Sequence, residues 1–523
     1  MIQKKLKIRR ALLSVSDKEE LVPLAQCLKD AGAELVATGQ TARLLQNAGL
    51  TITPIEQVSG SPEAFQGRMK TLSFPVCSGI LYRRKDPQDL VDLEKFGIAP
   101  IDCVVVNFYP FEQALTEEGI TRDELIEKID VGGPTLVRAA AKNAPDVLVL
   151  TGCHQYKAVM DQLQEHGAVS FSLVEACAEA AWEKVLHYDS VIASELGERK
   201  KLELRYGENP HQKGVLEWDP QSPLDWGGKL SAAELSYNNI LDLSSAYALA
   251  SDLIKRFSDS TAVVIVKHNN PCGVALVPRK VAHAQKVALT RAWEGDPVSA
   301  FGGVLVFTDP LEQECADWLA GHFVELVSAP QLEKNSEPFQ TLLARRKNLK
   351  AVQIHRFGEV PRESVVWVPG GRLRQTTDLQ EGEPLKSITG ESWSQEQQAL
   401  ASFGVLVCKA LKSNAIALVR QFHPGAFQLV GAGQGQPNRV DALKSLAIPR
   451  AQATLRASEG SLDQCMMISD AFFPFRDTVD EAHAAGIRWI VQPGGSIKDS
   501  ESIEACHEHG ISMALTGVRH FKH

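Results

Sequence analysis

A lysine and a histidine stand side by side where a short apolar run gives way to polar residues. Residues 262–266 are rich in β-branched side chains, and Lys267 and His268 follow them directly. Such a run predicts a buried strand of a parallel sheet, with the pair at its carboxyl end, where α/β sheets bind ligands. A histidine beside a cation can move protons between weakly basic nitrogens. A solvated turn with a capping histidine explains the same residues, so the pair alone does not decide.

The same segment contains half of a zinc signature. Pro271 and Cys272 begin the Pro-Cys-x-x-Cys pattern of zinc deaminases, but position 275 is alanine. We therefore predict no zinc site and expect Cys272 to be a packing residue.

Two strand-to-helix turns near the N-terminus carry hydroxyl groups, at residues 14–18 and 38–41. Helix N-termini offer unpaired N–H donors, so both turns predict phosphate sites. Ser16 and Thr41 acting only as helix caps is the alternative.

Four further polar residues fall in or just after predicted turns of the first 195 residues: Lys70, Tyr109, Asp130 and Lys142. Together they form a candidate acid–base set for a dehydrating ring closure. Ordinary surface residues would show the same spacing, so the spacing alone does not distinguish the two.

Loops of the second part contain mixed cationic, aromatic and glycine-rich segments. Residues 205–212 combine an arginine, a tyrosine and a histidine, and residues 431–439 alternate glycine with other residues. Alternating glycines leave the backbone open to a ligand. The glycine segment lacks the spacing of dinucleotide-binding and Walker motifs.

The bulk composition limits the classes of function. The chain has 523 residues, 44% of them hydrophobic and 23% charged, which indicates an ordinary globular protein of several domains. A net charge of -9 argues against a nucleic-acid partner. No apolar run is long enough to span a membrane, and ten scattered cysteines fit reduced thiols, so we expect a cytoplasmic protein.

Strand and helix patterns alternate along the chain and suggest its divisions. A long helical stretch over residues 173–196 closes a first domain, 1–197, and a second covers 198–523. Residues 370–392, rich in Gly, Thr, Glu and Gln, separate two halves of about 198–380 and 381–523.

A dozen of these motifs, in order along the chain, resemble the bifunctional purine-biosynthesis enzymes that combine AICAR transformylase with IMP cyclohydrolase. The motifs that carry the resemblance are residues 14–18, 67–71, 107–111, 129–133, 139–143, 205–212, 267–273, 296–303, 413–414, 431–439, 469–477 and 519–523.

The resemblance implies an α/β fold, with a methylglyoxal-synthase-like doubly wound domain followed by a transformylase of two related cytidine-deaminase-like halves. It implies formyl transfer from the co-substrate 10-formyltetrahydrofolate to AICAR, giving FAICAR, and then closure of FAICAR to IMP. No redox cofactor and no transition metal are expected. The family further implies a homodimer with the transformylase site at the subunit interface, without a nucleic-acid or membrane partner.

Carried over residue by residue, the resemblance assigns roles in formyl transfer. His268 assists deprotonation of the amine, Lys267 assists the developing charge or the leaving folate nitrogen, and Asn414 hydrogen-bonds the formyl oxygen. The nucleotide is held by Arg205, Tyr206, Arg519, Asn239, Glu325 and Phe521. The folate side is formed by Arg439, Phe472, Phe475, Asp477 and Ser496.

In the first domain the family's catalytic positions match Lys70, Tyr109, Asp130 and Lys142. Its substrate phosphate positions match Ser14, Ser16, Lys18, Thr38, Gly39, Thr41, Arg68 and Thr71. The departures are Gln40, which loses the access of glycine to positive φ, and Ser73 and Phe74, which replace His-Pro. They leave open the alternative of a transformylase with a weakened or inactive cyclohydrolase domain. A separate alternative is a non-catalytic purine-nucleotide-binding regulator on the same scaffold.

Overall fold

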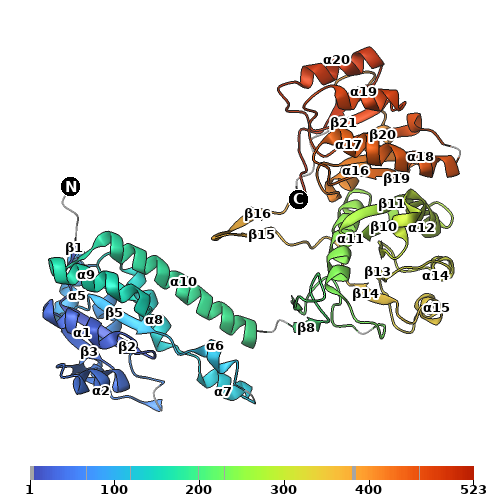
Figure 1. The fold of residues 1–523 in the computed structure, drawn as a ribbon. Coiled ribbons are helices and arrows are strands. Elements are labelled where there is room, and N and C mark those ends of the chain that lie inside the picture. Colours follow the sequence, from blue (N-terminus) through green and yellow to red (C-terminus); the bar gives the residue numbers. More distant parts are fainter. Residues whose placement is uncertain are drawn as a thin grey trace. The chain divides into compact units, whose positions relative to one another are not determined.

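The computed structural model describes residues 5–65, 68–117, 119–197, 200–228, 230–379, 385–458 and 460–523, and the chain divides into two compact units, 1–198 and 199–523 (Figure 1). We refer to them as unit 1 and unit 2. Residue 198, where the second domain was predicted to begin, lies outside the described ranges, as do Gly67 of the predicted 67–71 motif and the predicted boundary between halves at 380–381.

Unit 1 is built on a parallel sheet of five strands in the order β4-β3-β2-β5-β6. Its strands are β2 (Arg10–Val15), β3 (Glu34–Ala37), β4 (Thr53–Pro54), β5 (Cys103–Asn107) and β6 (Leu148–Leu150), with a separate pair β1 (Lys5–Leu6) and β7 (Val169–Ser170). Its helices are α1 (Leu21–Asp30), α2 (Gly39–Asn47), α3 (Ile55–Ser59), α4 (Phe74–Leu81), α5 (Pro87–Lys95), α6 (Phe111–Ala114), α7 (Arg122–Glu127), α8 (Gly132–Lys142), α9 (Tyr156–His166) and α10 (Phe171–Leu196).

The sheet of unit 1 is covered by helices on both faces. One core joins α1, α2 and α9 to the sheet, and the other joins α4, α8 and α10. Strands buried on both faces explain the continuous apolar runs of β2 and β5. This is the predicted doubly wound domain, and its parallel strands all end at the edge where the polar turns lie.

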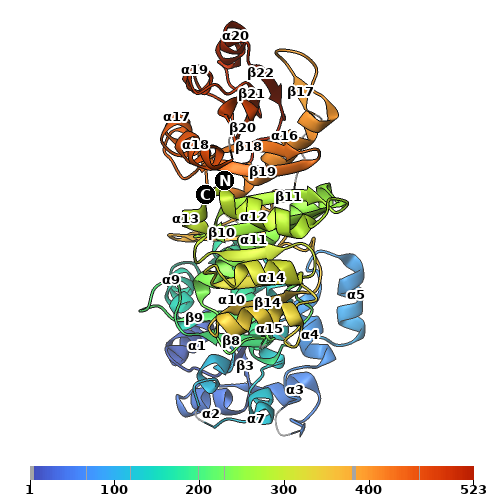
Figure 2. The same ribbon diagram turned by 90° about the vertical axis from the view of Figure 1, so that its right-hand side faces the viewer.

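Unit 2 contains one sheet of eleven strands, in the order β14-β13-β12-β10-β11-β19-β18-β20-β21-β22-β17 (Figure 2). The strands are β10 (Ser260–Lys267), β11 (Asn270–Pro278), β12 (Val304–Phe307), β13 (Leu326–Pro330), β14 (Lys350–Ile354), β17 (Lys386–Ser387), β18 (Ile416–His423), β19 (Ala426–Gly433), β20 (Cys465–Ser469), β21 (Trp489–Gln492) and β22 (Ser512–Leu515). Two further hairpins are formed by β8 (Lys200–Leu204) with β9 (Gly214–Trp218), and by β15 (Glu363–Val368) with β16 (Gly371–Thr376).

The helices of unit 2 pack on both faces of that sheet. They are α11 (Tyr237–Arg256), α12 (Ala284–Gly295), α13 (Pro297–Ala300), α14 (Gln313–Leu319), α15 (Glu337–Arg345), α16 (Gln395–Ala410), α17 (Arg439–Asp441), α18 (Ile448–Ala457), α19 (Asp477–Ala484) and α20 (Asp499–His509), with a π-helical turn at Ala442–Ala447. One core on the face of α11 and α16 runs through both halves, while the opposite face has a separate core for each half. The predicted capping box at Ser394 begins α16.

Each half of unit 2 repeats the same order: a helix, an antiparallel hairpin, and three strands that extend the sheet and are parallel to one another. Helix α11 precedes hairpin β10–β11, and α16 precedes hairpin β18–β19. The two hairpins pair with each other through β11 and β19, so the halves share one sheet. The predicted fold of two related α/β halves is confirmed.

The direction of the strand before Lys267 was predicted wrongly. Strand β10 is buried as expected, but it pairs antiparallel with both β11 and β12. Lys267 pairs with Asn270 across a two-residue turn, so the residues expected to form a ligand loop instead form the tip of a hairpin and the start of β11.

Candidate active sites

The tip of hairpin β10–β11 presents the lysine and histidine pair. Both central residues of the turn have positive φ, 52° at His268 and 62° at Asn269, as in a type I′ hairpin turn. The side chain of Lys267 turns back, and its ammonium donates to the carbonyl of Gly302 at 2.6 Å. Lys267 is thus fixed in orientation, while His268 is exposed at the tip.

A buried acid on α11 holds this tip. The carboxylate of Asp242 accepts the backbone N–H of Asn269 at 2.6 Å. Burial raises the pKa of Asp242, and the backbone N–H groups of Asn269 and His268 lower it in part. Asp242 was not among the predicted site residues. An acid at an inward position of an amphipathic helix is the signal that could have pointed to it.

The second element of the site is the loop that precedes β18. The side-chain NH₂ group of Asn414 donates to the carbonyls of Gln436 at 3.0 Å and Pro437 at 3.1 Å. Its side-chain oxygen accepts from the guanidinium of Arg439 at 2.7 Å. These partners fix the orientation of the Asn414 amide.

Arg439 is buried inside this network. Besides Asn414, its guanidinium donates to the carboxylate of Asp470 at 3.0 Å and to the carbonyl of Phe472 at 2.9 Å. The exposed fraction of its side chain is 7%, and that of Asp470 is 0%. A buried ion pair of this kind orders the groups it touches. In this structure Arg439 therefore supports Asn414 rather than presenting an open surface.

The hairpin tip and the Asn414 loop lie next to each other. The side-chain oxygen of Asn270, at the start of β11, accepts the backbone N–H of Lys412 at 3.2 Å. A cavity of about 170 Å³ adjoins the tip. It is lined by Lys267, His268, Asn270, Pro271, Cys272, Gly295, Asp296, Ser299, Leu429, Gly431, Ala432, Gln434 and Arg450.

Two of the glycines near this cavity serve packing. A Cβ at Gly431 would lie 2.3 Å from the carbonyl oxygen of Ala447, and one at Gly433 would lie 1.8 Å from that of Ala442. These glycines let β19 approach a helix backbone, so packing accounts for a glycine at both positions. Cys272 packs as predicted, with its thiol 3.5 Å from the carbonyl of Ile265, and burial raises its pKa to about 12.

Several residues predicted for the nucleotide side come together in pairs. Asn239, which is buried at the start of α11, donates to the carboxylate of Glu325 at 2.7 Å. The guanidinium of Arg519 lies 4.4 Å from the ring centre of Phe521. Arg205 and Tyr206 follow β8, with the guanidinium 5.7 Å from the tyrosine ring centre.

The residues predicted for the folate side divide into two groups. Phe475 is exposed, and the ammonium of Lys498 lies 4.8 Å from its ring centre. The backbone N–H of Lys498 donates to the hydroxyl of Ser496 at 3.1 Å, so Ser496 lies beside the residue whose ammonium contacts Phe475. Asp477 accepts the N–H of Thr478 at the start of α19, whereas Phe472 contributes a carbonyl to the buried network.

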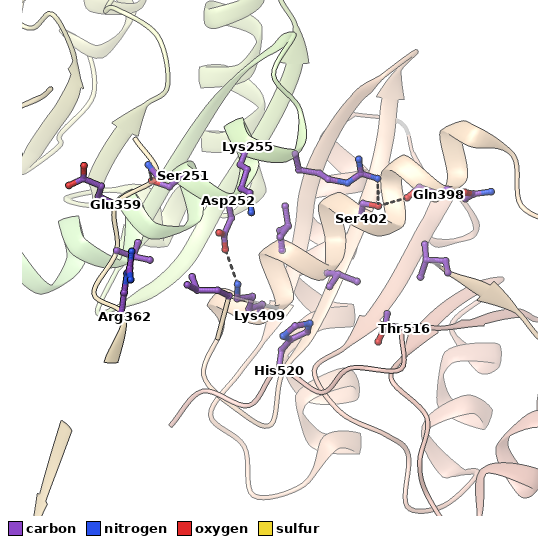
Figure 3. Close-up of a pocket in the computed structure, with 17 residues that line it drawn as sticks. Ser251, Asp252, Lys255, Glu359, Arg362, Gln398, Ser402, Lys409, Thr516 and His520 are labelled. Atoms are coloured by element: carbon purple, nitrogen blue, oxygen red, sulfur yellow. Dashed lines mark hydrogen bonds and ion pairs between the residues drawn. The ribbon is translucent and has the colours of Figure 1, made fainter. Parts of the chain in front are cut away.

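A second cavity, of about 1030 Å³, lies elsewhere in unit 2 (Figure 3). It is lined by α11, α16, residues 358–362 and the C-terminal segment, which contributes Thr516 and His520. Asp252 and Lys409 form an ion pair of 3.0 Å at its edge. None of the predicted site residues lines it, so size alone does not identify the reactive site.

In unit 1 the two predicted phosphate turns meet at the ends of neighbouring strands. The hydroxyls of Ser14 and Thr38 lie 3.0 Å apart, and Thr41 exchanges hydrogen bonds with the backbone of Val15. The first turn is ordered by Asn107, whose side-chain oxygen accepts the N–H of Ser16 at 2.5 Å. Asn107 was within a predicted motif but was not expected to have this role.

Neither Ser16 nor Thr41 acts as a helix cap, since α1 begins at Leu21 and α2 takes Thr38 as its N-cap residue. The ammonium of Lys18 donates to the carbonyl of Ser16 at 3.0 Å. The alternative that these hydroxyls only cap helices is therefore wrong.

The predicted acid–base residues of unit 1 are only partly brought together. The carboxylate of Asp130 accepts the backbone N–H of Gly133 at 2.9 Å and also that of Tyr109. Burial raises the pKa of Asp130 above its ordinary value despite these bonds. Lys142, in contrast, is at the far end of the 11-residue helix α8, about 15 Å away along its axis.

Lys70 lies against the second phosphate turn. A Cβ at Gly39 would be 2.6 Å from the ammonium of Lys70, which also forms an ion pair of 3.2 Å with Glu63. Thr71 is buried, and its hydroxyl would lie 2.8 Å from a Cβ at Gly132, so it adjoins the Asp130 turn.

The departures from the family motifs are accommodated by local structure. Gln40 lies within α2, whose helical conformation needs no positive φ at that position. Ser73 caps α4 by accepting the N–H of Val76, and the ring of Phe74 packs edge-on against Phe96. Arg68 is exposed and forms an ion pair with Glu127.

Comparisons with known proteins show the family of the chain. A family model described as AICARFT/IMPCHase bienzyme matches residues 140–450, and one described as MGS-like domain matches residues 20–135. A solved structure titled "Crystal structure of ForH" is 35% identical and covers 36% of this chain and all of its own, with a TM-score of 0.33.

Relatives named bifunctional purine biosynthesis protein PurH match nearly the whole chain. The proteins of Persephonella marina and Aquifex aeolicus are each 39% identical, over 98% of this chain and 100% of their own. That of Acetivibrio thermocellus is 39% identical over 99% of this chain and 100% of its own. The chain therefore belongs to the family of AICARFT/IMPCHase bienzymes.

Proposed function

We propose that unit 2 transfers a formyl group to the amine of AICAR at the tip of hairpin β10–β11, and that unit 1 closes the product FAICAR to IMP. The chain is a bifunctional enzyme of purine biosynthesis, with formyltransferase and IMP cyclohydrolase activities. The observation that carries the placement of the first site is the hydrogen bond from Lys412 to Asn270, which joins the tip to the Asn414 loop.

The amine of AICAR is a weak nucleophile because its lone pair is delocalised into the imidazole ring, so it must lose a proton as the new bond forms. His268, exposed at the tip, accepts that proton. One N–H of the Lys267 ammonium donates to the carbonyl of Gly302. Another is directed toward the charge that develops on the leaving folate nitrogen. Asn414 donates to the formyl oxygen by exchanging one of its two carbonyl partners.

The formyl donor is 10-formyltetrahydrofolate. An aromatic face and polar groups are what a pterin and its glutamate tail require, and Phe475, Ser496 and Asp477 supply them at one surface. The nucleotide occupies the side of Arg205, Tyr206, Asn239, Glu325, Arg519 and Phe521. Neither reaction changes an oxidation state, so the chemistry of the proposal requires no redox cofactor.

In unit 1 the phosphate of FAICAR binds the hydroxyls and N–H groups of the turns at Ser14 and Thr38. Lys70 lies beside that turn. Asp130, with its raised pKa, accepts a proton during ring closure, and water leaves as the second product. Tyr109 adjoins Asp130, and Lys142 reaches the substrate from the other end of α8.

A homodimer is proposed from an exposed hairpin. Every described residue of β15 and β16 is exposed, including Val365, Val366, Trp367 and Leu373, and the hairpin extends away from the sheet (Figure 1). Apolar side chains gathered in this way fit a protein interface. A second copy of the chain covers them, so Trp367→Glu should shift the molar mass measured by light scattering from dimer to monomer.

The cytoplasm is the proposed location. All ten cysteines, which lie within the described ranges, are free thiols, as expected in a reducing compartment. The structure contains no helix, in the part of the chain that it describes, that is long and apolar enough to cross a membrane.

Two alternatives make different predictions for separate assays of the half-reactions. A transformylase with a decayed cyclohydrolase would formylate AICAR but leave FAICAR unchanged. A non-catalytic regulator would bind AICAR or IMP without turnover. The relatives named as bifunctional enzymes favour the bifunctional enzyme over both.

The deciding variant is His268→Ala. We expect it to abolish formyl transfer and to leave the conversion of synthetic FAICAR to IMP unchanged, because the two reactions occupy different units. Equal loss of both activities would refute the assignment of the reactions to two sites.

A further inference from the structure

The C-terminal segment of the chain is bound to the loop that presents Asn414. The N–H of Ser413 donates to the carbonyl of Lys522 at 2.8 Å, and the N–H of Lys522 donates to the hydroxyl of Ser413 at 3.0 Å. This reciprocal pair ties the segment to the residue immediately before Asn414.

The side chain of Lys522 is half-buried at the end of a helix. Its ammonium donates at 2.9 Å to the carbonyl of Ala410, the last residue of α16. The last carbonyls of a helix have no partner within the helix and carry the negative end of its dipole, so a cation is favoured there. Lys522 thus caps α16 four residues before Asn414.

The surroundings of the Lys522 ammonium disfavour its charged form. Burial lowers the pKa of Lys522, and the nearby cation Lys412 lowers it further. Within the described ranges, no carboxylate forms an ion pair with Lys522, so a helix end compensates its charge.

We propose that Lys522 is a positioning residue for formyl transfer, and that it acts by fixing the segment from Ala410 to Asn414. Its ammonium fixes the end of α16, and its backbone fixes Ser413. The short loop between these two points has little freedom left. This inference rests on the proposed role of Asn414 at the formyl oxygen.

The rest of the C-terminal segment is anchored independently of Lys522. The N–H of His520 donates to the carbonyl of Asp470 at 3.0 Å, and its ring lies 2.7 Å from the carboxylate of Asp378. A change at Lys522 therefore leaves the segment docked, which allows its side chain to be tested in the folded, full-length protein.

The test compares Lys522→Met, Lys522→Arg and a matched control, Lys444→Met. Lys444 belongs to the same unit, has a side chain that is 61% exposed, and pairs with Glu481. We expect Lys522→Met to lower kcat for formyl transfer at least tenfold, with KM for AICAR changed less than twofold and FAICAR closure unchanged. Lys522→Arg, which keeps the charge, should recover part of kcat, and Lys444→Met should match the unmodified enzyme.

The pH profile provides a readout that a merely structural role would not affect. The ammonium form holds the loop below its pKa, so formyl transfer should fall at alkaline pH as Lys522 deprotonates, beginning below the ordinary value of 10.5. Lys522→Met and Lys522→Arg should both lack this alkaline limb. A kcat of Lys522→Met equal to that of the unmodified enzyme, or a matching loss of FAICAR closure, would overturn the proposal.

Asn414→Ala separates this proposal from the one it rests on. If Asn414→Ala retains formyl transfer, the role of Asn414 itself is wrong, and the positioning role of Lys522 fails with it. If Asn414→Ala loses formyl transfer while Lys522→Met keeps it, the role of Lys522 alone is wrong.

Discussion

Asp242 should be required for formyl transfer, because it holds the backbone of the hairpin tip that carries His268. Its carboxylate accepts the N–H groups of Asn269 and His268, both of which have positive φ. Side chains other than glycine adopt that conformation at a cost of roughly 1–2 kcal/mol per residue. Hydrogen bonds to a charged acceptor contribute about 1.5–3 kcal/mol each. The two bonds are therefore large enough to offset the strain of the tip.

Replacing Asp242 with alanine removes the carboxylate that accepts the two N–H groups and leaves the strained turn without support. If about 3 kcal/mol of positioning is lost, kcat/KM for formyl transfer should fall on the order of 100-fold. Asp242→Asn keeps the shape and one neutral acceptor, so about tenfold of loss is expected. FAICAR closure in unit 1 should not change in either variant.

The assay measures both half-reactions at steady state, together with thermal unfolding. Asp252→Ala is the matched control, because Asp252 lies on the same helix and pairs with Lys409 instead of the hairpin. We expect its formyl transfer to stay within twofold of the unmodified enzyme. An Asp242→Ala enzyme with unchanged kcat/KM and unchanged Tm would refute the reasoning, since the tip would then need no support from α11.

Three further predictions test other parts of the structure. Gly39→Ala places a Cβ 2.6 Å from a lysine ammonium at φ +32°, so cyclohydrolase activity should fall at least tenfold while formyl transfer is unchanged, as the two half-reaction assays would show. The pKa of Asp130 is raised in the folded protein, so the ionisation of Asp130 destabilises unit 1 as pH rises through the folded-state pKa. Asp130→Asn should therefore raise Tm at pH 7 but not at pH 3.5, as measured by calorimetry. Gly433→Ala meets a backbone oxygen at 1.8 Å and should lower the free energy of unfolding by about 3 kcal/mol, whereas Gly435→Ala, in open space at φ +65°, should lose about 1 kcal/mol in the same denaturant titration. An unchanged cyclohydrolase rate, an unchanged Tm or equal losses at the two glycines would contradict these expectations in turn.

Most strands and helices could be predicted from the sequence because burial imposes clear patterns. The run at residues 262–266 lies within β10, and the stretch at 173–196 lies within α10. The direction of β10 could not be predicted in the same way. A hairpin is usually indicated by a glycine in its turn and by a following strand without proline. The turn of β10–β11 has no glycine, and Pro271 lies within β11 where the register shifts, so neither signal is present.

The family could be predicted from the sequence, but the contacts of the candidate site residues could not. Motif order along the chain indicated the family, whereas the partners of each side chain depend on tertiary packing. Arg439 shows the difference: its sequence position suggested a folate contact, and the structure buries it between Asn414 and Asp470. The roles of individual residues remain predictions that the proposed variants test.

The two repeated hairpins of unit 2 differ in the residues of their turns. The second hairpin turns at Pro424 and Gly425, and the positive φ of 71° falls on the glycine, which bears it without strain. At the equivalent place the first hairpin has His268 and Asn269, which bear positive φ only with external support. Backbone strain that the surroundings must stabilise is characteristic of functional sites. Of two turns built on one plan, the strained one has His268 at its tip, and this is the turn at which we place the proposed formyl transfer, with Asn414 supplied by the second half.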